Sequence, residues 1–187
     1  SIGYHNYKFE SNENYLIVKS LIDFKITKLG IDLYSYNGTT DEEYQQNQLI
    51  NFSSKTNQNK KIKNTKITFD KKKDKLVISG SENQSITPKE YLVGTWWNHE
   101  IIRVKAQISA VSGRIIDQKV VFLGKEKINL YGKTYNSLRF NITSTDQSLS
   151  ENKKLDIDVW YEEGTNIWLK AAFKKKGNWE YRLKNKN

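Results

Sequence analysis

Hydrophobic and polar residues alternate along much of the chain, most regularly in its last third. Leu155, Ile157 and Val159 are separated by aspartates, and a second alternating run at 167–173 follows a turn that contains Gly164. An alternation of period two places one side of a strand in a core and the other side in solvent. The pattern therefore predicts a β-sheet protein.

Further runs of this kind, separated by short turns, extend the prediction to the whole chain. The predicted strands cover residues 4–9, 15–27, 31–36, 42–48, 49–55, 61–69, 75–79, the surroundings of 108, 119–123, 127–130, 135–144, 155–162, 167–174 and 179–183. Turn residues such as Asn37 with Gly38, and Gly132 with Lys133, lie between them. Because short connections imply antiparallel neighbours, we expect an all-β fold: an antiparallel meander that forms a strongly curled sheet or a closed up-and-down barrel. We expect residues 1–187 to form one β-barrel-like domain.

One segment has the signals of a helix, near residues 88–102. Thr87 is a suitable N-cap residue, and Pro88 suits the first helical turn. We expect a single short helical segment in this range.

Composition limits the classes of protein to which the chain can belong. The chain has 187 residues, of which 36% are apolar and 28% are charged. No apolar run approaches the roughly 20 residues that a membrane-spanning helix needs. The chain starts at Ser1 and contains no Met, and we favour removal of a signal peptide over a proteolytic cut or a shortened chain as the reason. The absence of Cys fits an exported bacterial domain and also a cytosolic one. We expect an exported protein in the periplasm.

The net charge of +10 comes almost entirely from lysine. Arg, which reads bases and phosphates best, occurs only at positions 103, 114, 139 and 182. This bias favours a solvated surface over nucleic-acid binding. The densest lysine run, at 60–75, is typical of a hairpin with a charged outer edge. A weak association with anionic surfaces is an alternative role for these lysines.

The order of the segments resembles an uncharacterised family of bacterial exported proteins, the domain of unknown function six-one-three-four. The resemblance covers nearly the whole chain, and it rests on the segments 3–7, 24–36, 55–60, Gly94-Thr95-Trp96-Trp97-Asn98, 108–113, 123–126, 155–161 and 168–169. Ser109 stands where the family pattern has Asn, which puts a polar role of that turn in doubt. The resemblance implies an antiparallel β-barrel-like fold and a periplasmic setting, and it implies no established activity.

The two histidines are the candidates for acid–base chemistry. His5 lies between Tyr4 and Tyr7, and His99 follows Asn98. If the fold brings an imidazole together with a carboxylate, either Asp156 or Asp158, the pair can abstract a proton or activate water.

The catalytic candidates are therefore His5 and Asp158. The structural alternative is a hydrogen-bonded strand histidine at position 5 and a half-exposed turn histidine at position 99. Two histidines alone make a weak metal site, so we expect no metal and no cofactor.

Large aromatic side chains are numerous for a chain of this size. Rings with a few polar tips line many small-molecule pockets, although core packing accounts for most rings in most proteins. The adjacent Trp96 and Trp97 are the exception, since neighbours in an extended chain point to opposite sides. The predicted ligand-binding residues are Tyr4, Tyr7, Tyr36, Trp96, Trp97, Asn98, His99 and Trp160.

Three functions remain open at this point. The leading hypothesis is a periplasmic binding or carrier protein that holds a hydrophobic or amphipathic small molecule in an aromatic-lined cavity. The alternative is an isomerase, lyase or hydrolase that uses His5 as general acid or base in the same cavity. The third hypothesis is a structural module of the cell envelope with a solid interior.

Overall fold

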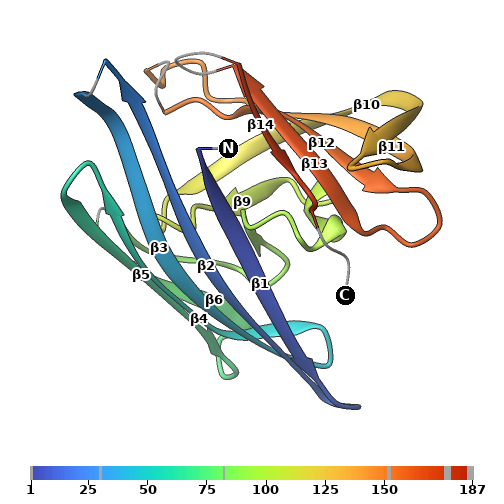
Figure 1. The fold of residues 1–187 in the computed structure, drawn as a ribbon. Coiled ribbons are helices and arrows are strands. Elements are labelled where there is room, and N and C mark those ends of the chain that lie inside the picture. The colour runs from blue at the N-terminus through green and yellow to red at the C-terminus, as the bar shows by residue number, and fades with distance from the viewer. Residues whose placement is uncertain (1, 30, 82, 151–152, 175–177, 185–187) are drawn as a thin grey trace. The chain divides into compact units, whose positions relative to one another are not determined.

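The computed structural model describes residues 2–29, 31–81, 83–150, 153–174 and 178–184. In these residues two seven-stranded sheets account for almost all regular structure, and in both of them strands that follow each other in the chain lie side by side (Figure 1). Every strand pairing for which a register is established is antiparallel. The all-β antiparallel meander is confirmed, with one of the two sheets curled into a half-barrel.

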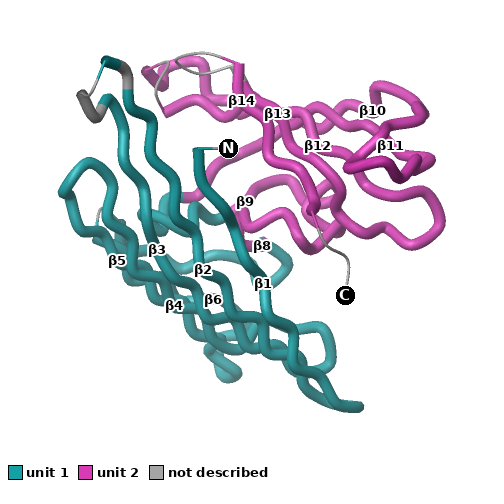
Figure 2. The backbone as a smooth tube through the Cα atoms, viewed as in Figure 1, with its two compact units in different colours: residues 1–91, 108–114 teal, residues 92–107, 115–187 magenta. Residues whose placement is uncertain are grey.

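The chain divides into two compact units, shown in teal and magenta in Figure 2. Unit 1 comprises residues 1–91 and 108–114, and unit 2 comprises residues 92–107 and 115–187. The expectation of one domain over residues 1–187 stays a prediction.

Unit 1 contains the first sheet. Its strands, in both sequence and spatial order, are β1 (Gly3–Ser11), β2 (Tyr15–Lys28), β3 (Ile31–Gln45), β4 (Gln48–Gln58), β5 (Lys61–Asp70), β6 (Lys75–Gly80) and β7 (Gln84–Pro88). Side chains alternate between a buried inner face, which includes Val18, Phe52 and Ile67, and an exposed outer face. The apolar alternation that predicted the strands therefore also sets which face forms the core.

Unit 2 contributes the second sheet. Its elements in chain order are β8 (Leu92–Val93), the 3₁₀-helix η1 (His99–Ile102), β9 (Ala106–Ile108), β10 (Ile115–Leu130), β11 (Lys133–Ser144), β12 (Asp156–Glu162), β13 (Trp168–Lys174) and β14 (Asn178–Arg182). The expected helical segment near 88–102 is confirmed as η1, at the end of that range. Its N-cap is Asn98, whereas Thr87 and Pro88 belong to β7.

Two predicted turns are instead continuous strand. Asn37 and Gly38 lie within β3, where Gly38 pairs with Ile22 on one side and with Thr56 on the other. The segments 119–123 and 127–130 are both parts of β10, which a β-bulge between Phe122 and Gly124 interrupts. A glycine in a strand marks a bulge or a close approach as readily as a turn, so local sequence does not separate these cases.

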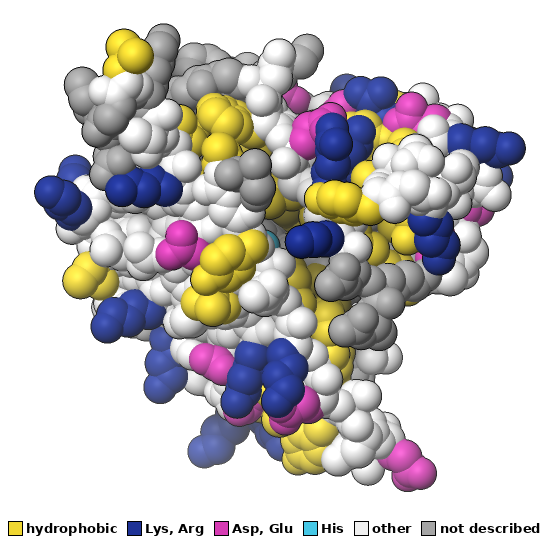
Figure 3. All heavy atoms as spheres, in the orientation of Figure 1, with side chains coloured by type: hydrophobic (Ala, Val, Ile, Leu, Met, Phe, Trp, Pro, Cys, Tyr) yellow, Lys and Arg dark blue, Asp and Glu magenta, His cyan; other side chains and the backbone are white. Residues whose placement is uncertain are grey.

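The lysine-rich segment forms the predicted hairpin, but it does not lie at a sheet edge. It spans β5 and β6, which are flanked by β4 and β7. Asp70 closes the hairpin turn by accepting the backbone N–H groups of Lys72 and Lys73 at 3.0 and 3.2 Å. On the face shown in Figure 3 the basic side chains are spread out, with acidic side chains among them. This distribution is typical of a solvated surface.

In unit 1, the segment 108–114 lies on the inner face of the first sheet. The hydroxyl of Ser54 donates to the carbonyl of Ala110 at 2.5 Å. A Cβ atom on Gly80 would lie 2.2 Å from the carbonyl oxygen of Ser112, which is inside van der Waals contact. Gly80 is therefore required for the close approach of this segment.

In unit 2, the segment 92–107 is held against the second sheet by a buried amide. The Nε2 atom of Gln118 donates to the carbonyls of Ile101 at 2.7 Å and Val104 at 3.0 Å. Its Oε1 atom accepts from Nε2 of Gln107 at 2.6 Å. The apolar cluster beneath includes Ile101, Ile142 and Val159. In the part of the chain that the structure describes, no helix has the length and apolar character to cross a bilayer.

We predict that Gly80→Ala lowers the free energy of unfolding by roughly 3 kcal/mol, because the added methyl group overpacks a backbone contact. Gly132→Ala is the control: its φ of +86° makes the substitution strained, but a Cβ atom there meets nothing within 4 Å. We expect it to cost only about 1 kcal/mol. Urea unfolding measures both. Equal costs would contradict a close approach at Gly80.

We also predict that Gln118→Leu lowers the free energy of unfolding by roughly 2–4 kcal/mol, since it leaves a buried carbonyl, a partly buried carbonyl and a buried amide without their partner. Gln147→Leu removes only an exposed amide that donates to the Thr145 carbonyl at 3.4 Å. This control is expected to change stability by less than about 0.5 kcal/mol. A Gln118 variant as stable as the control would refute the anchoring role.

Candidate functional site: the inner face of the first sheet

Aromatic rings gather on the inner face of unit 1 near β1, β2 and β3. Phe24 lies between Tyr34 and Tyr36, with ring centroids 5.5 and 5.4 Å away. All three rings are half-buried. On β1 the His5 and Tyr7 rings are 4.3 Å apart. Half-buried stacked rings offer apolar surface to a further molecule.

A row of hydroxyl groups crosses the same face. Tyr7, Ser20, Thr40, Ser54 and Thr65 are successive cross-strand partners from β1 to β5. The hydroxyls of Ser20 and Thr40 are hydrogen-bonded at 2.7 Å. Thr65 is 1% exposed, and its Oγ1 atom has no hydrogen-bond partner among the described residues. Buried hydroxyls without a partner are rare, because desolvating them has a cost of about 1–3 kcal/mol.

His5 is another unpartnered polar group on this face. Its Nε2 atom is buried without a hydrogen-bond partner among the described residues. Burial lowers the pKa of the His5 imidazole to about 4, so the ring is neutral at pH 7. A neutral imidazole has one donor and one acceptor nitrogen, and it offers either group to a polar ligand.

A buried carboxyl lies deeper on this face. Glu42 is fully buried, and its Oε2 atom accepts a hydrogen bond from the Tyr44 hydroxyl at 2.7 Å. Burial raises the pKa of Tyr44, and the adjacent Glu42 raises it further. Burial likewise raises the pKa values of Tyr34 and Tyr36. All three tyrosines are therefore neutral hydrogen-bonding groups at physiological pH.

The structure distributes the predicted site residues over both units. His5, Tyr7 and Tyr36 share the inner face of the first sheet, whereas Tyr4, which pairs with Asp23, lies on the outer face and is 52% exposed. The other predicted residues belong to unit 2.

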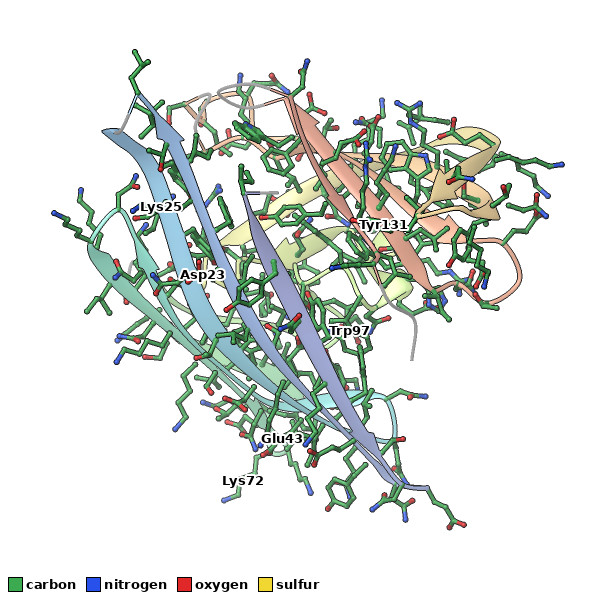
Figure 4. All side chains as sticks on the ribbon, in the orientation of Figure 1. Asp23, Lys25, Glu43, Lys72, Trp97 and Tyr131 are labelled. Carbon is green, nitrogen blue, oxygen red and sulfur yellow. The ribbon has the colours of Figure 1, made fainter. Side chains whose placement is uncertain are left out.

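The segment around η1 holds four of these residues, and two of them, Trp96 and His99, contact Tyr161. The Tyr161 hydroxyl donates to the carbonyl of Trp96 at 2.9 Å, and its ring meets His99 edge-on at 6.4 Å. The Oδ1 atom of Asn98 caps η1 by accepting the Glu100 N–H at 3.1 Å, and Nε2 of His99 lies 2.8 Å from a Glu100 carboxylate oxygen. Trp97, labelled in Figure 4, is half-buried. Because it caps η1, Asn98 has a local structural role.

Trp160 and Asp158 lie on the opposite face of the second sheet from Tyr161. The Trp160 ring packs against Arg139 and Lys170, whose charged groups are 4.8 and 4.0 Å from its centroid. The carboxylate of Asp158 accepts hydrogen bonds from Nε of Arg139 at 3.1 Å and from Nδ2 of Asn141 at 2.9 Å. His5 and Asp158 belong to different units, so their proposed catalytic pairing stays a prediction.

Two surface hollows, of about 270 and 260 Å³, lie elsewhere. The first is lined by Lys125, Glu126, Lys127, Asn136, Ser137 and Glu163. The second is lined by Asp41, Glu43, Asn51, Phe52, Ser53 and Lys66, and Figure 4 labels Glu43. Neither contains a residue predicted to bind the ligand.

Sequence reasoning named His5, Tyr7 and Tyr36 as site residues but missed the hydroxyl row and Glu42. Serine and threonine are common in strands, and only the register shows that five of the hydroxyls are neighbours.

Comparison with known proteins places the chain in a family. A family model described as a domain of unknown function, DUF6134, covers residues 1–184. No curated protein and no solved structure matches the chain.

We predict that His5 makes stability depend on pH. The imidazole of the unfolded chain takes up a proton near its ordinary pKa of 6.5, but burial lowers the pKa of the folded one to about 4. The unfolded state therefore binds more protons in this window, and stability is lost as the pH falls through it, by roughly 1.4 kcal/mol per pH unit.

The test compares urea unfolding of the wild type and His5→Gln at about pH 7.5 and about pH 4. Carboxylate titrations are common to both proteins and cancel. The wild type is expected to lose about 3 kcal/mol more than the variant on acidification. An equal loss in both proteins would show that His5 titrates normally.

Proposed function

Since the chain belongs to DUF6134, a family of domains of unknown function, we propose its function from the geometry of unit 1: it binds or carries a hydrophobic or amphipathic small molecule. The observation that supports this most is the inner face, which combines half-buried stacked rings with a row of hydroxyls and the unpartnered Nε2 of His5. Rings that contact an apolar group next to a few fixed polar groups are characteristic of small-molecule sites.

The two kinds of surface suit the two ends of an amphipathic ligand. Phe24, Tyr34 and Tyr36 provide the apolar contact area. His5, on the neighbouring strand, offers the hydrogen-bonding capacity of its unpartnered Nε2 atom to a polar group. A ligand that satisfies Nε2 of His5 recovers the cost of leaving that atom unpaired, and this recovered energy favours binding.

The alternative is an enzyme in which His5 is the general base. A general base works best when its pKa is near the working pH. With a pKa of about 4, the neutral imidazole of His5 is a weak acceptor for a proton at pH 7. This low basicity is our reason for ranking binding above catalysis.

The proposed setting is the periplasm, and this proposal rests on the family resemblance.

We predict that the uncharged fluorescent probe N-phenylnaphthylamine binds saturably to the protein and that Phe24→Ala weakens this binding about tenfold, because the substitution removes the central ring of the stack. Tyr4→Ala is the matched control, since it removes an aromatic ring from the outer face of the same sheet. It is expected to leave the affinity unchanged.

Fluorescence titration gives the affinities, and urea unfolding shows whether each variant is folded. If Phe24→Ala is unfolded, Phe24→Leu takes its place. Equal affinities of the inner-face variant and the Tyr4 control, or no binding by the wild type, would rule out the proposed site.

A further inference from the structure

β10 is much longer than the strand beside it. It has 16 residues, whereas its neighbour β9 has 3. On the side of β9, backbone hydrogen bonding extends along β10 as far as Gln118, whose N–H donates to the Lys105 carbonyl at 2.9 Å. The order of the sheet gives β10 no neighbour other than β9 and β11. Among the described residues, β10 therefore pairs only with β11 from residue 119 onward.

The backbone hydrogen bonds of β10 show which of its groups face this open edge. Thr145 donates to the Asp117 carbonyl at 3.0 Å, so the odd-numbered residues before the bulge bond to β11. In an antiparallel pair, residues whose backbone groups bond to the partner strand alternate with residues whose backbone groups point away from it. The N–H and C=O groups of Val120 and Phe122 accordingly face the open edge. After the bulge the alternation shifts by one residue, so the backbone N–H and C=O groups of Lys125 and Lys127 are the ones that face the open edge.

The open edge carries exposed apolar side chains. Val121, Phe122 and Leu123 are 38%, 53% and 49% exposed. The Phe122 ring is held against Phe140 at 5.2 Å. Three adjacent exposed apolar residues on a free strand edge form a template for another strand.

Lysines surround this apolar group. Lys119 precedes it, and Lys125 and Lys127 follow it. Of the acidic residues nearby, Glu126 accepts the Trp160 indole N–H, Glu163 pairs with Lys125, and Asp117 lies at the paired end of β10. Because Lys125 is already paired with Glu163, the lysines that remain for the carboxylates of an added strand are Lys119 and Lys127, one on each side of the apolar group.

The bulge and the lysines of this edge disfavour a second copy of the chain. Lysines and bulges protect strand edges from such self-association. They do not oppose a strand with carboxylates at its ends.

We propose that the open edge of β10, from Lys119 to Lys127, binds an extended peptide segment of a partner protein by strand addition, and that this segment has apolar residues flanked by acidic ones. The site lies in unit 2 and is independent of the small-molecule site proposed for unit 1.

Two labelled, end-capped peptides test the proposal: Glu-Val-Thr-Val-Thr-Val-Glu and the same sequence with Lys at both ends. Fluorescence anisotropy is expected to show that the acidic peptide binds about tenfold more tightly than the basic one, and less tightly at high salt. Equal affinities for the two peptides, or no binding of the acidic one, would overturn the proposal.

Val120→Pro removes a backbone donor that faces the open edge, and it is expected to weaken binding of the acidic peptide about tenfold or more. If this variant does not fold, the double variant Lys119→Glu/Lys127→Glu replaces it, and its preference should reverse toward the basic peptide. Lys66→Glu, on the first sheet, is the charge control and should bind as the wild type does. If Val120→Pro or the double variant folds and still binds the acidic peptide as tightly as the wild type does, strand addition at this edge is contradicted.

Sedimentation and vesicle binding distinguish the other occupants. A wild-type dimer that Val120→Pro dissociates would assign the edge to a second copy and overturn the proposal. Binding to phosphatidylglycerol vesicles without binding to the acidic peptide would also overturn it, in favour of an anionic membrane surface.

Discussion

The candidate site depends on antiparallel register. From β1 to β5 each strand pairs with the next so that Tyr7, Ser20, Thr40, Ser54 and Thr65 fall in one row. A slip of one residue in any pairing would turn the following strand over and send its inward side chains into solvent. The apolar residues of the adjacent row, Val18, Phe52 and Ile67, prevent such a slip because they are buried only in this register. Core packing thus fixes the position of the polar row.

Each unit uses a polar anchor to hold an irregular segment against its sheet. In unit 1, Ser54 bonds the 108–114 segment, and Gly80 allows its backbone to approach. In unit 2, Gln118 binds the carbonyls of Ile101 and Val104. Carbonyls in irregular segments lack the ladder partners that strands supply, so a buried side chain must replace them. The segments that carry Ser109 and Trp96 are positioned in this way.

The sequence predicted the strands well because alternation reports directly on which side chains are buried. It failed where a turn residue lies inside a strand, as at Gly38 and Gly124, because a local signal does not reveal the partner strand. It predicted Tyr7 and Tyr36 as site residues, without the arrangement of the rings around them. His5 and Asp158 were grouped from residue type alone, and they lie in different units. The hydroxyl row has no sequence signal, since it exists only across strands.

The unsatisfied groups on the inner face provide the strongest argument about function. A solid core excludes unpaired polar atoms, because each has a cost of about 1–3 kcal/mol that an apolar side chain of similar size avoids. Valine in place of Thr65 or an aliphatic residue in place of His5 would fill nearly the same space without that cost. A polar group retained at such a position is expected where it gains a partner in a bound state. The low pKa of His5 favours a hydrogen-bonding role in this state over proton abstraction, because the imidazole stays neutral and has little tendency to keep a proton.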